Sequence, residues 1–399
     1  MSSTDPTRSA PAPTASSASW NLGDLVIHRI DEIALPPETG PWLLPGVTKD
    51  VIGQAPWLRP DFADAEVPFL AGHTFAVEAG GLRVLVDTGI GNGKTRANPA
   101  WNSLNTDYLA RLSAAGFAPE SVDLVIITHL HTDHVGWNTR PDGDSWVPTF
   151  PNARYLTSRA EWDYWAATEL DANRLQMFAD SVHPVRDSGL IDLADVPGNG
   201  RQVAAGIRLV PAPGHTPGQI AVELRGADRS ALITGDSIHH PVQLSHPHLV
   251  SCVDIDPEQA VRSRHQLLDT LADTDSLLLG THFPQPTAGL VRRDNGNYRL
   301  HPEPGIAWRC GTGPPGAEGD PQRPADRREV ARTGRCRRVP AARVTGANPA
   351  PPGGPSPGCR QALEVLRHSS RAWCPGRVRG RRRGRPRRPR RQGPRGRWT

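Results

Sequence analysis

Cysteine is scarce in most of this chain. Of the five cysteines in 399 residues, only Cys252 lies before residue 309, and the four that follow show no CxxC spacing. Neither a disulfide framework nor a thiolate zinc site is indicated, which fits a reducing compartment. No apolar run approaches the length of about eighteen residues that a membrane span needs. Residues 1–19 lack the apolar segment of a secretory signal, so we expect a cytoplasmic protein without membrane association.

The first 308 residues also lack an excess of positive charge. They contain 22 basic and 36 acidic residues, a net charge of about −14. Residues 309–399 contain 24 arginines, no lysine and five acidic residues, a net charge of about +19. The acidity of the larger part argues against a nucleic-acid-binding core. The tail consists mainly of Arg, Pro, Gly and Ala and cannot bury enough apolar surface to fold, so we predict that it is disordered.

Three parts are therefore expected: a disordered leader (1–19), a folded domain (20–308) and the basic tail (309–399). Within the domain, segment 35–65 is Pro-rich and predicted to be an ordered but irregular arm. Ser158 with Glu161, and Asp256 before Pro257, are typical helix starts. The predicted helices span 106–115, 158–170 and 257–272, and the predicted strands span 24–33, 68–78, 82–88, 122–128, 206–211, 219–225, 230–234 and 276–279. This alternation indicates buried sheets covered by helices, in an α/β or α+β class.

Two short motifs do not support the functions that they suggest. The glycine-rich loop Gly89 to Lys94 lacks the spacing of a phosphate-binding P-loop. The Gly354-x-Ser356-x-Gly358 match to a nucleophile elbow is flanked by prolines, with no strand before it and no helix after it.

Four side chains able to bind metal lie within six positions, directly after the apolar run 124–127. They are His129, His131, Asp133 and His134, in Thr-His-Leu-His-Thr-Asp-His-Val-Gly-Trp-Asn, residues 128–138. His129 and His131 are two residues apart, so in an extended chain they point the same way and can share one ion. Asp133 and His134 follow once the chain turns and suit a second ion. Imidazole with carboxylate favours zinc, iron, manganese or cobalt over calcium or magnesium.

Three further candidates each follow a predicted strand. His215 lies in Pro-Gly-His-Thr-Pro-Gly (213–218), Asp236 in Thr-Gly-Asp (234–236) and His282 in Gly-Thr-His (280–282). A single histidine is usually structural, but ligands on several strand ends converge when those ends lie along one edge of the sheets.

The complete set resembles the metallo-β-lactamase superfamily over residues 20–300. His129-x-His131-x-Asp133-His134 matches its signature, and His215, Asp236 and His282 follow in the expected order. The resemblance implies an α+β fold, an αββα sandwich of two mixed sheets flanked by helices, with a dinuclear metal site at one edge. In that family pattern His129, His131 and His215 hold the first metal, Asp133, His134 and His282 hold the second, and Asp236 bridges them. Asp87 matches the first motif, which usually supports the ligands through hydrogen bonds.

The resemblance implies a metal-dependent hydrolase with two divalent ions, most often Zn²⁺, although Fe, Mn or Co also fit the ligands. The two ions would lower the pKa of a shared water, and the resulting hydroxide would attack an ester-type carbonyl, with Asp133 handling the proton. Asp236 stands where the best-known β-lactamase branch has Cys. This and residues 235–241 are similar to the N-acyl-homoserine lactonase and methyl-parathion-hydrolase-like groups, so a lactone is the expected substrate. A glyoxalase-II-like thioesterase and an organophosphate (phosphotriester) hydrolase stay open as alternatives.

Residues that contact the substrate are less well defined. Trp137 and Asn138 follow the metal turn and are expected to face the mouth of the site. His239 is a candidate for substrate contact and His240 for hydrogen-bonded support of the ligands. Other aromatic and histidine side chains are expected elsewhere: Trp162 and Trp165 in the core, and His183 in an exposed loop.

The expected partner is a small-molecule substrate, without specific nucleic-acid binding, and a homodimer would be usual for relatives of this kind. A non-enzymatic alternative is that the arginine-rich tail binds nucleic acid or anionic surfaces. Its charge suffices for salt-sensitive binding, but it lacks the interleaved aromatics of specific recognition.

Overall fold

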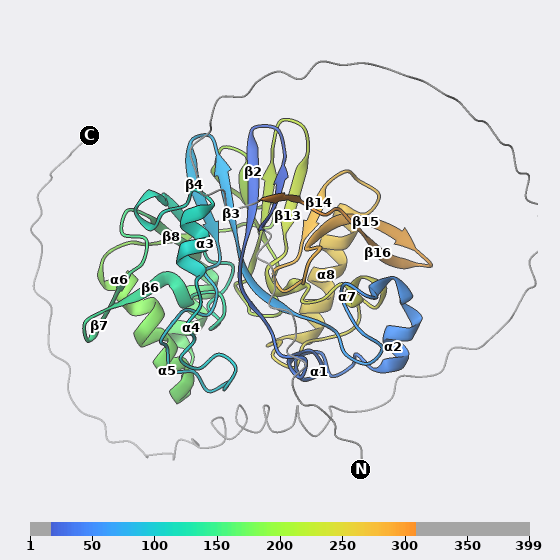
Figure 1. Ribbon diagram of the computed structural model, residues 1–399, viewed down its shortest axis with the longest axis horizontal. Helices are drawn as coiled ribbons and strands as arrows, with labels where there is room; N and C mark the ends of the chain where they lie inside the picture. Colours follow the sequence, from blue (N-terminus) through green and yellow to red (C-terminus); the bar gives the residue numbers. More distant parts are fainter. Residues whose placement is uncertain (1–16, 309–399) are drawn as a thin grey trace, which may run out of the picture. The chain divides into compact units, whose positions relative to one another are not determined.

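Two mixed β-sheets that share one hydrophobic core form the centre of the fold (Figure 1). The computed structural model describes residues 17–308, which lie in one compact unit. The first sheet has eight strands in the order β17-β1-β2-β3-β4-β5-β8-β9, and the second has seven in the order β10 to β16. Strands β4, β5, β8 and β9 run parallel, as do β13 and β14, whereas β2, β3 and β4 are antiparallel.

The first sheet comprises β1 (Ser17–Asn21), β2 (Leu25–Ala34), β3 (Ala71–Ala79), β4 (Leu82–Val86), β5 (Leu124–Ile126), β8 (Arg154–Ser158), β9 (Ile191–Ala194) and β17 (Ile306–Trp308). The second comprises β10 (Arg201–Ala204), β11 (Ile207–Pro211), β12 (Ile220–Arg225), β13 (Ser230–Ile233), β14 (Leu277–Leu279), β15 (Ala288–Asp294) and β16 (Asn297–Pro302). The helices are α1 (Thr39–Leu43), α2 (Lys49–Gln54), α3 (Tyr108–Ala114), α4 (Arg159–Ala167), α5 (Ala172–Met177), α6 (His183–Asp187), α7 (Val242–Ser245) and α8 (Pro257–Leu271). Short helical turns are η1 (Pro56–Leu58), η2 (Pro119–Ser121), η3 (Gly136–Asn138), η4 (Phe178–Val182) and η5 (Gly235–Ser237), and β6 (Thr139–Asp142) pairs with β7 (Ser145–Pro148) in a separate hairpin.

Apolar side chains that alternate along the strands produce the four layers. In β4, Val84 and Val86 belong to the core between the sheets, whereas Leu85 packs in the cluster that includes α3. In β14 the central residue Leu278 packs instead with Leu268 of α8, on the outer side of the second sheet. Helices thus cover the outer face of each sheet, and the predicted αββα sandwich is confirmed.

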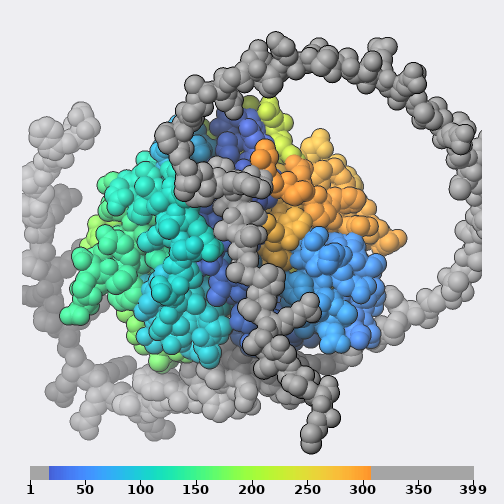
Figure 2. All heavy atoms as spheres, in the orientation of Figure 1, coloured from blue at the N-terminus to red at the C-terminus, as the bar shows by residue number. Residues whose placement is uncertain are grey.

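The Pro-rich arm is ordered, as expected, and contains α1, α2 and η1. Its side chains Leu44, Ile52 and Phe62 are buried in the same cluster as Leu268 of α8. Figure 2 shows the arm in blue at the surface, beside the orange C-terminal strands.

The predicted helix starts are confirmed by their caps. Ser158 Oγ accepts a hydrogen bond from Glu161 N, and Asp256 Oδ1 accepts one from Gln259 N. The strands absent from the prediction are β1, β8, β9, β10, β15, β16, β17 and the two strands of the β6–β7 hairpin. Most of them are too short for periodicity to separate strand from helix. The turn Asn295-Gly296 has positive φ angles, the Asn-Gly hairpin signal that joins β15 to β16, and the prediction omits it.

Some predicted boundaries shift. Strand β1 begins at Ser17, so the end predicted for the leader, residue 19, falls inside a strand. His183 begins helix α6 and is half-buried, so the exposed loop expected there is wrong. The basic tail and the match at 354–358 lie outside the described residues. Among residues 17–308, no helix is long and apolar enough to cross a membrane.

Candidate metal centre

The seven predicted ligands lie in loops that follow strand ends at one edge of the two sheets. Strands β4 and β5 are parallel neighbours, so Asp87 and the histidine motif leave the first sheet on the same side. Strands β13 and β14 are also parallel, with Ile233 beside Leu279. Asp236 lies three residues after Ile233, and His282 lies three residues after Leu279. Parallel pairing therefore brings ligands that are distant in sequence to one place.

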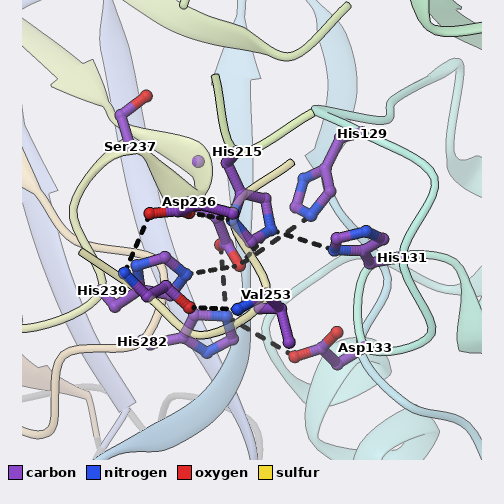
Figure 3. Close-up of polar contacts among 12 residues, drawn as sticks. His129, His131, Asp133, His215, Asp236, Ser237, His239, Val253 and His282 are labelled. Carbon is purple, nitrogen blue, oxygen red and sulfur yellow. Dashed lines mark hydrogen bonds and ion pairs between the residues drawn. The ribbon is translucent and has the colours of Figure 1, made fainter. Parts of the chain in front are cut away.

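Three imidazoles form the first group. His129, His131 and His215 each direct one ring nitrogen inward, and these atoms lie within 4.8 Å of one another. Nδ1 of His131 is 2.9 Å from Nε2 of His215. Figure 3 shows these rings turned toward a common centre with Asp236 beside them.

Asp236 lies between the two halves of the cluster. Its Oδ2 is 3.8 Å from His129 Nε2 and 3.4 Å from His215 Nε2. Its Oδ1 is 3.4 Å from His134 Nε2 and 3.2 Å from His282 Nε2. One oxygen thus faces each group of histidines, as a bridging carboxylate would.

Asp133 completes the second group from the side of the cavity. Its Oδ1 is 3.7 Å from His134 Nε2, and its Oδ2 is 3.6 Å from His282 Nε2. The Asp133 side chain is 14% exposed, against 5% for Asp236. Asp133 is therefore the carboxylate of the cluster that a bound substrate can reach most easily.

Burial and neighbouring charge set the protonation of the cluster. Burial lowers the pKa values of His129 and His131 well below the usual range, so both are neutral and able to donate a lone pair. Burial also opposes charge on His134, but the carboxylates of Asp236, Asp87 and Asp133 outweigh it and raise the pKa of His134 well above its usual value. A cation that binds there must displace this proton.

A cavity of about 230 Å³ opens onto the cluster. It continues into a groove of about 650 Å³, because both are lined by Thr39, Trp42, Trp101, Thr132 and Asn173. The remaining lining of the inner cavity is Leu35, Leu43, His131, Asp133, Asp171, Arg174, His215, Asp236, Val253 and His282. The cluster therefore lies at the end of a partly aromatic channel.

Comparison with known families accounts for this arrangement. Residues 67–282 match the profile of the family described as "Metallo-beta-lactamase superfamily". The chain belongs to this superfamily. Its membership confirms the resemblance seen in the sequence, and the protein is a metal-dependent hydrolase.

Several relatives within the metallo-β-lactamase superfamily are similar over most of the folded region. N-acyl homoserine lactonase AttM of Agrobacterium fabrum is 27% identical over an alignment of 249 residues, and the match covers 58% of this chain and 87% of AttM. The solved structure of AidC, a dizinc quorum-quenching lactonase, has a TM-score of 0.59 at 21% identity and covers 72% of this chain and 97% of its own. The solved structure of the hydrolase AbOPH has a TM-score of 0.59 at 24% identity, and the match covers 73% of this chain and 99% of the AbOPH chain. At these identities the solved structures show a shared fold.

The donor atoms of this metallo-β-lactamase domain fit the divalent metal ions that the superfamily implies. His129 Nε2, His134 Nε2 and Asp236 Oδ1 are buried and have no hydrogen-bond partner among the described residues. Unpaired buried polar atoms are costly, and here they converge on one point. Three imidazoles on one side and a mixed imidazole and carboxylate set on the other suit two borderline-soft cations such as zinc.

Two acidic residues orient the ligands. Asp87 was expected in this role, and its Oδ2 lies 2.9 Å from His134 Nδ1. Asp254, which was not predicted, lies 2.8 Å from His215 Nδ1 through its Oδ1. Such contacts fix which ring nitrogen faces the metal. No local sequence signal marks Asp254, because only the fold brings it to His215.

Glu161 is a further residue that the sequence places without revealing its role. Its carboxylate was expected to close a capping box, but it instead joins two ligand loops. Oε1 accepts from Leu130 N and Trp165 Nε1, and Oε2 accepts from Thr216 Oγ1 and Gly218 N. Trp165 is buried, as predicted for a core residue.

The orientation expected for Trp137 and Asn138 is wrong. Both are buried, and neither lines the cavity. Trp137 Nε1 donates to Glu32 Oε1, and its ring stacks on Tyr108. Asn138 Oδ1 accepts from Thr88 Oγ1. The turn η3 directs both side chains into the protein.

The two histidines after Asp236 differ in their surroundings. His239 Nε2 is 3.3 Å from Asp236 Oδ2, but the ring is fully buried and does not line the cavity, so in this structure it supports Asp236 instead of facing a substrate. His240 contacts none of the seven candidate ligands. Its Nε2 donates to Phe62 O, and its Nδ1 accepts from Val242 N. His240 therefore attaches the Pro-rich arm and does not support the ligands as expected.

Proposed function

We propose that this protein hydrolyses the ester bond of a lactone at a centre of two divalent cations, most often zinc. The observation that carries the proposal is the placement of Asp236, one oxygen toward each histidine group, at the end of the cavity. The relatives named N-acyl homoserine lactonase support a lactone as the substrate class.

Two cations held by these residues would lower the pKa of a bound water and polarise the carbonyl oxygen of the ester. The chain's own residues position the reaction. The Asp236 side chain is buried among the histidines, whereas the Asp133 side chain is more exposed at the wall of the cavity. Asp133 is therefore suited to take the proton of the attacking water and return it to the alkoxide that leaves when the C–O bond of the ring breaks.

The shape of the channel suits an ester with an apolar substituent. Trp42 and Trp101 border both the inner cavity and the outer groove. Apolar and aromatic walls supply binding energy through burial, and polar groups near the cluster fix orientation. A reacting ring in the inner cavity would leave its substituent between these two indoles.

The proposal is tested by metal analysis combined with a substrate panel. The purified full-length protein is assayed with N-hexanoyl-homoserine lactone, γ-butyrolactone, S-lactoylglutathione, a phosphotriester and a penicillin. We expect about two equivalents of divalent metal and the highest kcat/KM on a lactone. Absence of turnover on every lactone would refute the proposal, and the best remaining substrate would identify a thioesterase or phosphotriesterase instead.

Two variants separate metal binding from proton transfer. Asp133→Asn should lower kcat roughly 100-fold or more, the size of a general acid–base contribution, even under saturating metal. His131→Ala should lose metal and activity together. Asp144→Asn, an exposed substitution in the β6–β7 turn, is the matched control and should change neither.

A further inference from the structure

Arg174 is a cation beside the metal cluster that has no acidic partner among residues 17–308. It lies in helix α5 and lines the inner cavity together with His131 and Asp133. Among the described residues no carboxylate oxygen lies within 4.0 Å of its guanidinium. A half-buried cation without a counter-ion at the wall of a cavity is suited to a ligand of opposite charge.

The acidic residues nearest to Arg174 are used elsewhere. Both oxygens of Glu161 already accept two hydrogen bonds each. Asp171 caps helix α5, and its Oδ1 accepts the backbone N–H of Arg174. The Arg174 guanidinium itself stacks over the ring of Trp165, with Cζ 4.1 Å from the ring centroid. Stacking holds the plane of the guanidinium but satisfies none of its N–H donors.

The guanidinium of Arg174 also contacts the imidazole of His131, but this contact is not a hydrogen bond once the cluster binds metal. Nη2 of Arg174 is 3.4 Å from Nε2 of His131. Because His131 Nδ1 faces His215 inside the cluster, Nδ1 is the nitrogen that can bind a cation. A neutral imidazole that binds metal through Nδ1 carries its proton on Nε2. Two donors then face each other at the cavity wall.

We propose that Arg174 and the Nε2–H of His131 together bind a carboxylate carried by the substrate. An anionic oxygen is the acceptor that satisfies both donors, and the planar guanidinium can bind a carboxylate through two parallel hydrogen bonds. This inference rests on the proposed ester hydrolysis and narrows it, because the preferred lactone would be an anion with its charge a few atoms from the reacting carbonyl.

The test compares matched charged and neutral lactones. The series consists of γ-butyrolactones whose ring bears a carboxylate through zero to three methylenes, each paired with its primary carboxamide. For the best linker, wild type should favour the carboxylate over the carboxamide in kcat/KM by roughly 10- to 100-fold, the size of a charged bidentate contact. Arg174→Met should bring this ratio close to one, and Arg174→Lys should give an intermediate ratio. The exposed Arg159→Met is the control and should keep the wild-type ratio.

A binding measurement separates this proposal from the reaction itself. Calorimetry on the metal-loaded protein uses tetrahydrofuran rings with the same linkers and carboxylate, which cannot be hydrolysed. We expect Arg174→Met to weaken binding at least 10-fold at unchanged metal content. The proposal would be overturned if wild type had the same kcat/KM for charged and neutral lactones. It would also be overturned if Arg174→Met bound the carboxylate as tightly as wild type. If wild type cleaves no lactone, the proposed function fails, and the calorimetry still decides whether Arg174 binds a carboxylate.

Discussion

Oδ2 of Asp87 lies 2.9 Å from Nδ1 of His134, and this contact decides which ring nitrogen is directed at the metal cluster. Asp87 has a φ of 58°, an unusual conformation for a residue with a side chain. Both of its oxygens also accept hydrogen bonds from Thr128, one from the backbone N–H and one from the hydroxyl. With Nδ1 paired to Asp87, Nε2 of His134 is directed at Asp236. The strained backbone thus holds a ligand in one orientation.

Asp87→Asn should weaken metal binding in the half of the centre that contains His134. The amide keeps the size of the side chain but removes the charge that favours a proton on Nδ1. Loss of such an orienting carboxylate typically costs about 10- to 100-fold in metal affinity. Competition with a chelator, read by metal analysis, measures the change. Asp144→Asn, on the exposed β6–β7 turn, should retain wild-type affinity. An unchanged affinity in Asp87→Asn would show that burial alone orients His134.

Glu161→Gln should destabilise the fold and disturb the first histidine group. The amide nitrogen that this substitution introduces cannot accept the hydrogen bonds that one carboxylate oxygen accepts now. Either the donors of Leu130 and Trp165 or those of Thr216 and Gly218 therefore lose their partner. The expected loss in free energy of unfolding is about 2 to 3 kcal/mol. Denaturant titration measures it, with the exposed Glu120→Gln as the control. A change below about 0.5 kcal/mol, of the order seen on surfaces, would contradict this role.

The sequence predicts the site far better than it predicts its supports. His129, His131, Asp133 and His134 are recognisable because their spacing is local, and each remaining ligand follows an apolar strand. Asp254 and Arg174 carry no such signal, because only tertiary packing brings them to His215 and His131. The sequence predicts Glu161 only as the capping-box partner of Ser158, although its carboxylate accepts hydrogen bonds from two loops. For such residues the local pattern does not contain the partner.

Trp137 was misplaced for a related reason. Its position directly after the metal turn suggests the mouth of the site, but the preceding residue decides the direction of the chain. A Cβ on Gly136 would lie 1.9 Å from the backbone of Ile90. The N–H of Gly136 also donates to Gly89 O at 2.7 Å. The glycine-rich loop and the metal turn are therefore in direct backbone contact, which turns Trp137 inward.

Gly136→Ala should consequently be one of the most damaging small substitutions in the domain. The added methyl meets backbone atoms, which cannot move aside as a flexible side chain can, so the loop and the metal turn must separate. We expect a loss of about 3 kcal/mol or more in the free energy of unfolding, at the upper end for overpacking, together with weaker metal binding. Gly53→Ala in helix α2 is the control. Its Cβ would meet nothing within 4 Å, and it should stabilise by about 0.5 to 1 kcal/mol. Equal effects of the two substitutions would contradict the contact.

His240 links the stability of the domain to pH. The ring is fully buried, and burial lowers its pKa from 6.5 to about 4, against a small opposing effect of the hydrogen bond to Phe62 O. Because Val242 N donates to Nδ1, this nitrogen must be unprotonated in the folded state. Protonation would break that bond and place a charge among the apolar side chains that hold the Pro-rich arm.

The sign of the pH effect follows from the two pKa values. Between pH 6.5 and about 4 the unfolded chain binds a proton at His240 and the folded chain does not, so stability falls as the pH falls through this window. At pH 4 the loss in free energy of unfolding is about 3 kcal/mol, since each pKa unit between the two states corresponds to about 1.36 kcal/mol. His240→Gln keeps a donor for Phe62 O but does not titrate. Urea unfolding at pH 7 and pH 4, under identical metal conditions, should therefore show a larger loss in wild type than in His240→Gln by about that amount. Titration of the metal ligands affects both proteins equally, so parallel losses would exclude His240 as the titrating group.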